Sequence, residues 1–173
     1  MARVTYATMF TVSRDNVVSL ITDNVSDPIS SSAQSRKWIY SRMPDVKASS
    51  FSGYPFIIIN CMDVSDDDNF GSGTGKSLDM KSEMPVFTIE VEVVASDRGY
   101  GDSDAKAMAH IDAISNSIRS IFKSKTNRQT LRAASLSFAT MDSSITVPVT
   151  IANELAYSRT FTIGFKTKMQ VSA

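Results

Sequence analysis

The sequence predicts an α+β fold, in which a mixed, mainly antiparallel sheet carries two helices packed on one face of a single domain. Three observations predict this fold. Residues 54–60 read YPFIIIN, an apolar run of strand length, and residues 85–95 read PVFTIEVEVVA, an alternating strand pattern. A long amphipathic helix pattern follows the second strand. We therefore expect a sheet that buries one face beneath helices.

The first expected element is a helix that begins near Thr11 or Ser13, because either hydroxyl can cap exposed backbone N–H groups. Its apolar stripe at helical spacing consists of Val17, Val18, Leu20, Ile21 and Val25. Asp27-Pro28 is expected to end this helix, since proline disfavours helical backbone in the residue before it. The aromatic and branched residues of 36–43, RKWIYSRM, then predict a short edge strand.

The two central strands differ in pattern. The run from Tyr54 to Asn60 has no polar side, so we expect both faces of this strand to be covered. In the next strand, 86–94, one face carries Phe87, Ile89, Val91 and Val93. The other face carries Thr88, Glu90 and Glu92. The pattern favours a solvated sheet face for the two glutamates; the alternative places them in a subunit interface or a channel.

The remaining segments complete the sheet and its cover. The polar connection 62–84 is too long for a hairpin loop, so we expect it to be flexible or to become ordered against a partner. The seam of the long helix consists of Met108, Ile111, Ile114, Ser115, Ile118, Ile121 and Phe122. A short helical turn is expected around 127–134. Strands at 136–141, 145–151 and 158–169 then end the pattern.

Composition limits the function classes. A length of 173 residues fits one domain with a core of its own. Lysine plus arginine and aspartate plus glutamate number 18 each, so no overall charge favours nucleic acid. A single Cys61 excludes an internal disulfide and a cysteine-cluster metal site. No apolar run approaches the ~20 residues of a membrane helix, and the first residues lack the pattern of a secretory signal. We expect a protein made inside a cell and used there or built into a particle.

Residues 71–77, GSGTGKS, resemble a phosphate-binding P-loop and raise the alternative of a small nucleotide-binding enzyme. That motif requires its first glycine five residues before the Gly-Lys pair, a position that Phe70 occupies here. A P-loop also follows an apolar strand, whereas the acidic residues 66–68 precede these glycines and would repel a polyphosphate. A flexible loop is therefore favoured.

Other candidate sites also fail on residue type. When Asp66 and Asp68 are aligned with the first ligands of a calcium loop, Phe70 and Ser77 occupy later ligand positions and cannot coordinate the ion with carboxylates. His110 lies beside the helix seam with no nucleophile placed near it, which favours a half-buried structural histidine over a catalytic base. We predict no enzymatic activity, no catalytic residues, no cofactor and no metal.

Basic and aromatic residues alternate in the 36–42 segment, as they do in proteins that bind single-stranded nucleic acid. The balanced overall charge and the absence of a nucleic-acid motif favour an edge strand or an interface instead. A nucleic-acid-binding module remains an alternative for this segment.

Several segments together resemble the tail-terminator proteins of long-tailed bacteriophages, also called tail-completion or head–tail joining proteins. They are YPFIIIN, PVFTIEVEVVA, the D-x-I-x(3)-I pattern at 112–118 ahead of NRQTLRAAS, and the closing YSRTFTIGFKTKM. The resemblance covers residues 10–170 and lies in the pattern and order of the elements. It implies a structural virion protein, located in the tail–neck region and assembled in the host cytoplasm.

The resemblance further implies a sixfold ring that caps the finished tail tube, stops its polymerisation and presents its other surface to the head connector. The implied partners are other copies of the chain, the tail-tube protein, the head-completion or connector protein, and viral DNA passing through the channel, with no membrane. Interface contacts are expected from Arg36, Trp38, Tyr40, Asp66, Asp67, Asp68 and Lys76. Glu90 and Glu92 are expected in the channel or a subunit seam. The alternative within the same class is a connector stopper or a tail-tube subunit.

Overall fold

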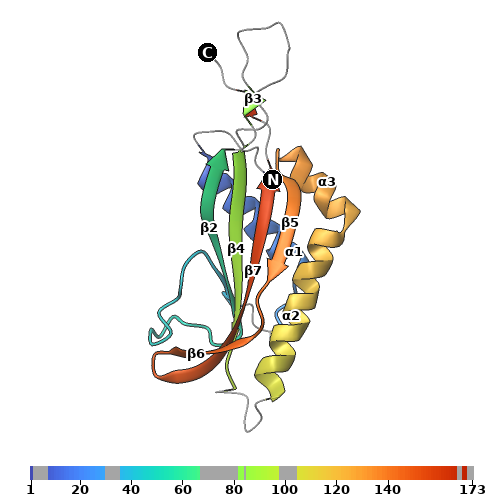
Figure 1. Ribbon diagram of the computed structural model, residues 1–173. Coiled ribbons are helices and arrows are strands. Elements are labelled where there is room, and N and C mark those ends of the chain that lie inside the picture. The colour runs from blue at the N-terminus through green and yellow to red at the C-terminus, as the bar shows by residue number, and fades with distance from the viewer. Residues whose placement is uncertain are drawn as a thin grey trace, which may run out of the picture.

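The computed structural model describes residue 1 and residues 8–29, 36–66, 82–83, 85–97, 105–166 and 169–170. In chain order the elements are α1 (Met9–Asn24), β1 (Ile39–Tyr40), β2 (Phe56–Asp66), β3 (Ser82–Glu83), β4 (Pro85–Ala95), α2 (Ala105–Lys123), α3 (Lys125–Ala133), β5 (Ser137–Ser143), β6 (Val147–Ile151), β7 (Glu154–Lys166) and β8 (Met169–Gln170). They form a mixed, mostly antiparallel sheet with three helices (Figure 1), which confirms the predicted α+β class.

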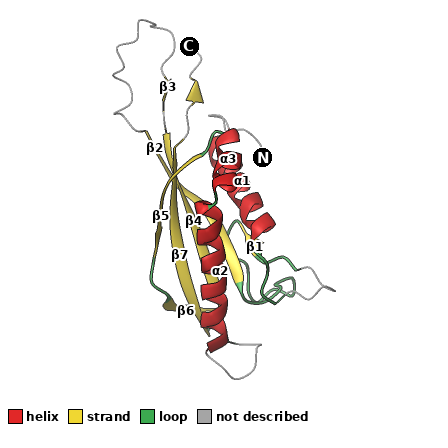
Figure 2. Cartoon of the chain, turned by 90° about the vertical axis from the view of Figure 1, so that its right-hand side faces the viewer, coloured by secondary structure: helices red, strands yellow, loops and turns green. Residues whose placement is uncertain are grey.

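The main sheet has six strands. Five follow the order β1-β2-β4-β7-β5, and β6 pairs with the first part of β7, so that β5 and β6 lie along the same edge. The β1–β2 pair is parallel, and the other pairs of this sheet are antiparallel. Figure 2 shows the three helices on one side of the sheet. The opposite side, here called the helix-free face, carries no described helix.

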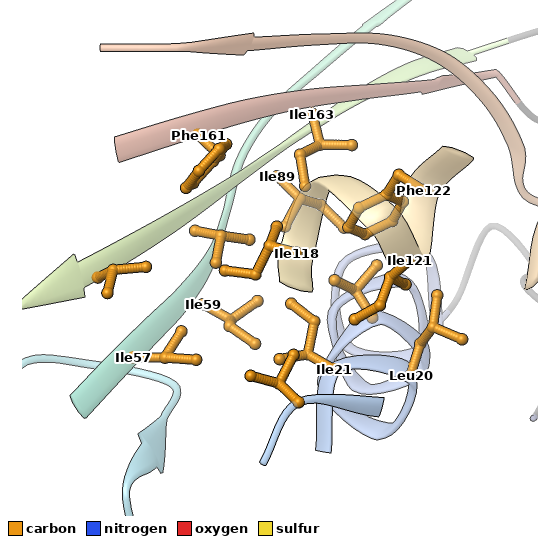
Figure 3. Close-up of a cluster of buried hydrophobic side chains, with 14 of the residues drawn as sticks. Leu20, Ile21, Ile57, Ile59, Ile89, Ile118, Ile121, Phe122, Phe161 and Ile163 are labelled. Atoms are coloured by element: carbon orange, nitrogen blue, oxygen red, sulfur yellow. The ribbon is translucent and has the colours of Figure 1, made fainter. Parts of the chain in front are cut away.

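The main core lies between the helices and the sheet. Figure 3 shows side chains of α1, α2 and the central strands meeting there. On β4 the four residues of the predicted inner face, Phe87, Ile89, Val91 and Val93, are fully buried. The α2 seam is buried as predicted, with Met108 half-buried. Each buried isoleucine or phenylalanine stabilises the fold by about 1.5–3 kcal/mol relative to an exposed one, so this layer dominates stability.

A second, smaller core covers the helix-free face near the beginning of β2. Its buried members are Tyr54, Phe56, Ile58, Val94 and Ala156. Half-buried residues of the 40–51 segment and of β6 pack over them. Because β2 is covered by helices on one side and by this cluster on the other, residues 56–59 are all buried. The prediction that both faces of this strand are covered is confirmed.

The predicted start of the first helix is wrong. Helix α1 begins at Met9 with Thr8 at the N-cap, and Thr8 makes no side-chain capping hydrogen bond. The Thr11 hydroxyl donates instead to the Thr8 carbonyl at 3.3 Å, and Ser13 is buried within the helix. A hydroxyl that faces the core cannot mark a helix end, and sequence spacing alone does not distinguish the two positions.

Several predicted strand ends also move. The predicted edge strand at 36–43 is reduced to the two residues of β1. Strand β2 continues to Asp66, beyond the predicted end at Asn60, because β4 offers backbone partners along its whole length. The expected flexible loop at 62–84 is therefore wrong for 62–66 and for 82–83, which are strand. Residues 67–81 and 84 lie outside the described residues.

The last long strand begins earlier than predicted. Strands β6 and β7 form a hairpin whose two-residue turn, Ala152-Asn153, has positive φ at both positions. Such turns match the twist of paired strands, and they extend β7 back to Glu154. The turn lacks the glycine that usually identifies this geometry in a sequence. The predicted helical turn at 127–134 is confirmed as the helix α3.

Candidate functional site: the helix-free face and the sheet edges

A row of polar side chains crosses the middle of the helix-free face. Asn60 of β2 lies opposite Glu90 of β4, which lies opposite Thr162 of β7, which lies opposite Asp142 of β5. Directly opposed side chains in antiparallel strands have Cβ atoms about 4.5–5.5 Å apart. Asn60 and Glu90 are half-buried, while Thr162 and Asp142 are exposed. The row therefore presents two carboxylates separated by one threonine.

Glu92 adds a third carboxylate next to this row. It lies two residues along β4 from Glu90, on the same face, and accepts a hydrogen bond from the Ser158 hydroxyl at 2.5 Å. Ser158 is buried, so this bond fixes the glutamate side chain to β7. Partial burial raises the pKa of Glu90 above its ordinary value, and the negative charge of Glu92 raises it further. We call Glu90, Glu92 and Asp142 the acidic strip.

The basic residues of β7 lie away from the acidic strip. Arg159 belongs to the helix side of the sheet, where it donates to Asp112 of α2 at 2.8 Å and to Thr146 at 2.9 Å. Lys166 is on the same side as the strip but at the far end of β7, opposite Val86. The centre of the helix-free face is therefore polar and negatively charged.

The β5–β6 edge is long and almost uncharged. Both strands pair with β7 on one side, and no described strand pairs with their other side. Asp142 is the single charged residue between Ser137 and Ile151. Two apolar side chains at this edge, Ile145 and Val147, are 80% and 40% exposed. Proteins protect such edges with charges, prolines or bulges. Here β5 has a register shift between Phe138 and Thr140 and β6 contains Pro148, but neither strand contains a lysine.

The opposite edge of the sheet is also open. Strand β1 pairs only with Ile57 and Ile58, so no described strand lies beside the outer side of β2 from Ile59 to Asp66. Each step from β2 through β4 and β7 to β5 is antiparallel. The two edge strands β2 and β5 therefore run in opposite directions. This is the relation that lets the β5 edge of one copy pair antiparallel with the β2 edge of the next.

Arg36, a predicted interface residue, is used inside the chain. Its Nε and Nη2 donate to the Asp27 carboxylate at 2.5 and 2.9 Å. The remaining donors contact the carbonyl oxygens of Ser52, Gly53 and Pro55. The five N–H groups of the guanidinium are thus all satisfied within the chain. This pair ties the segment after α1 to the segment before β2, and it leaves no donor for a neighbour.

Trp38 and Tyr40 are also packed internally. Trp38 is 8% exposed and belongs to the main core. The Tyr40 ring meets the Phe56 ring edge-on at 5.9 Å, and its hydroxyl donates to the Lys37 carbonyl at 2.8 Å. Tyr40 is half-buried, so part of its ring stays accessible. Of these predicted contact residues, Tyr40 alone retains a surface that another molecule can touch.

The other predicted contact residues fall at or beyond the end of β2. The backbone of Asp66 pairs with Pro85 as the last residue of that strand. Asp67, Asp68 and Lys76 lie outside the described residues. Asp66 is therefore separated from Tyr40 by most of the length of β2, so the structure does not bring the two predicted interface groups together. Asp142 and the β5–β6 edge were not predicted as functional.

His110 is half-buried on α2, as the sequence indicated. Burial lowers its pKa, and the nearby charges of Asp27 and Arg36 act in opposite directions. Cys61 is half-buried and packs against the main core.

Two further observations concern ligands and membranes. Within the described ranges, histidine, cysteine and carboxylate side chains form no group of three that could hold a metal ion. None of the described helices combines the length and the apolar character needed to cross a membrane.

No protein-family model and no curated protein sequence matches the chain.

Proposed function

We propose that this chain is a structural virion protein that assembles head-to-tail into a ring. The ring caps a phage tail tube, ends tube polymerisation and joins the tail to the head connector. The observation that carries the proposal is the pair of open sheet edges of opposite direction, one of which has a single charge along fifteen residues, Ser137 to Ile151. The resemblance of the strand and helix patterns to tail-terminator proteins supplies the biological setting.

The edges favour a closed assembly for a geometric reason. A rotation about an axis along the strands preserves strand direction, so β5 of each copy meets β2 of the next in antiparallel orientation. The same heterologous contact is repeated by every copy, and repetition under rotation closes into a ring. Each contact satisfies backbone N–H and C=O groups that an isolated subunit leaves to solvent.

The position of the helices on one side of the sheet favours the other side as the lining of the ring's channel. Helices add bulk to one side of the sheet only, and a closed ring has more room on its outside. The helices therefore occupy the outside, and the helix-free face with its acidic strip lines the channel. A negatively charged lining suits passage of DNA. Non-specific binding of DNA depends mainly on contacts between phosphates and basic side chains, and carboxylates repel the phosphates, so the DNA does not adhere to the channel. In the proposed ring, Glu90 and Glu92 therefore line the channel rather than a subunit seam.

The test combines light scattering with negative-stain microscopy on three forms of the protein. The wild-type chain should form closed rings one subunit thick, alone or after addition of tail tubes. The variant I145K/V147K adds lysines to the β5–β6 edge and should remain monomeric in both conditions. The control F10K/S19K adds the same charge at two exposed positions of α1, away from that edge, and should still form rings.

Each contrary result has a defined meaning. A wild-type chain that is monomeric with and without tail tubes contradicts the proposal. Open, elongating tubes assign the chain to the alternative of a tail-tube subunit. Equal loss of rings in both lysine variants shows that the β5–β6 edge is not the contact surface.

A further inference from the structure

A surface pocket lies between β1 and the start of β2. It has a volume of about 450 Å³, and its lining includes Lys37, Tyr40, Arg42, Met43, Pro44 and Phe51. The aromatic wall is held in place from below, because Tyr40 and Phe51 both meet the Phe56 ring edge-on. The Arg36–Asp27 pair fixes the backbone of residues 52–55, directly after the pocket. The pocket is therefore formed mainly by the segment that connects β1 to β2, and its aromatic residues are anchored on the smaller core.

The two cations of the pocket are uncommitted to carboxylates. Lys37 Nζ lies 5.3 Å from the centroid of the Tyr40 ring, a cation–π contact that leaves its N–H donors available. Neither Lys37 nor Arg42 forms an ion pair with a described residue, although both are exposed. By contrast, Arg36 and Arg159 each pair with an aspartate of the chain. Charge complementarity thus calls for an anionic ligand.

The apolar and acidic residues of the lining indicate which kind of anionic ligand fits the pocket. Met43, Pro44 and Phe51 place apolar surface beside the cations, which fits a ligand that carries both a carboxylate and an apolar side chain. Asp45 also lines the pocket and partly offsets its two cations, which disfavours the continuous negative charge of a nucleic-acid backbone more than a short peptide with separate carboxylates. Stacking of bases requires accessible ring faces, but the Tyr40 face holds Lys37 and Phe51 packs against Tyr54 and Phe56. These contacts favour a peptide over single-stranded DNA.

We propose that this pocket binds an acidic peptide segment of a partner protein. Carboxylates of that segment pair with Lys37 and Arg42, and a neighbouring apolar side chain packs against Met43, Pro44 and Phe51. Most of the residues that line the pocket belong to the segment between β1 and β2, which lies at the end of the sheet where β2 begins and where β6 also lies (Figure 1). This placement rests on the proposed function: in the ring, this end of the subunit faces along the axis and meets the next component of the particle.

The experiment measures fluorescence anisotropy of a labelled, acetylated Asp-Leu-Asp-Glu-Leu peptide with the full chain. The wild-type protein should bind it in a salt-dependent manner, and the matched peptide Asn-Leu-Asn-Gln-Leu should not bind. The variant K37Q/R42Q should weaken the affinity at least tenfold. The control K125Q/R132Q removes the same charge from exposed positions of α3 and should change the affinity less than twofold.

Three outcomes would overturn the proposal: no binding of the acidic peptide, equal weakening in both double variants, or displacement of the peptide by an oligothymidine that binds more tightly through the same residues. The last outcome assigns the pocket to nucleic acid. Ring formation and peptide binding of the wild-type chain, measured side by side, separate the two proposals. Rings without peptide binding contradict the pocket alone, and peptide binding without rings contradicts the ring alone.

Discussion

At the residue scale, Arg36 holds together the segment that follows α1 and the segment that precedes β2. Its guanidinium and the Asp27 carboxylate are 12% and 6% exposed, and each atom that can bond does so within the chain. Removal of one partner from a buried pair leaves the other charged and unpaired, which costs roughly 3–5 kcal/mol. The pair thus specifies how the segment after α1 meets the segment before β2.

The variant R36M should lower the free energy of unfolding by about 3–5 kcal/mol, since methionine keeps the aliphatic stem but leaves Asp27 unpaired. Urea denaturation followed by circular dichroism measures the loss. The control R132M, at an exposed position of α3, should stay within about 0.5 kcal/mol of wild type. A loss of less than about 1 kcal/mol for R36M would show that water replaces the guanidinium.

Because of its raised pKa, Glu90 makes the folded state less stable as the pH rises. Its pKa is raised above the ordinary glutamate value of 4.5, so the folded state holds this proton to higher pH than the unfolded state. Stability therefore falls as pH rises through the raised folded pKa, and it is favoured at the acidic side of that window. The charges that face Glu90 on the sheet are Glu92 and, beyond Thr162, Asp142.

The variant E90Q removes that titration and should be more stable than wild type at pH 7, with a difference that disappears when the pH is lowered below 4.5. Urea midpoints measured between pH 4 and pH 8 provide the comparison. The variant D23N, at an exposed position of α1, serves as the control for loss of one carboxylate. An E90Q difference that grows towards acidic pH would reverse the assigned sign.

At the element scale, the sequence determined strand faces better than strand ends. The alternation in 86–94 predicted the four buried residues of β4. It also predicted that Glu90 and Glu92 lie on the opposite face of that strand. The extension of β2 was not predictable from its own polar residues, because pairing with β4 produces it. Asp142 reaches the acidic strip only through a register shift between Phe138 and Thr140, which no local pattern encodes.

The β6–β7 hairpin offers a second test at this scale. Ala152 and Asn153 have φ values of 51° and 68°, and a left-handed conformation costs an alanine about 1–2 kcal/mol. The variant A152N/N153G installs the Asn-Gly pair preferred in such turns and should raise the free energy of unfolding by about 0.5–1 kcal/mol. Thermal unfolding measures the gain.

The matched control for the hairpin is A139N, which makes the same alanine-to-asparagine change at an exposed position of β5 without positive φ. It should give no gain, because the backbone there is not strained. A gain of equal size in A139N would attribute the effect to surface polarity instead of turn geometry.

At the scale of the whole molecule, the proposed ring gives three features one explanation. Helices cover one face of the sheet and the other face is acidic at its centre (Figures 1 and 2). Among the described residues, no strand pairs with the outer sides of β5 and of β2 beyond Ile58, and these two strands run in opposite directions. An exposed edge with a single charged residue promotes aggregation of a monomer. A closed ring removes both edges and turns the acidic face into a channel lining.

Charge reversal of the acidic strip tests this arrangement. The variant E90K/E92K/D142K should bind DNA in a strongly salt-dependent way, because the ring would gather the new positive charges of every copy in one channel. The control D15K/D23K/N116K/S120K makes the same change in net charge at exposed positions outside both the strip and the pocket. Electrophoretic mobility shifts at several salt concentrations should give the strip variant roughly tenfold higher affinity than the control. Equal affinities would mean that the strip does not line a channel, and the helix-free face would then have to meet a protein partner instead.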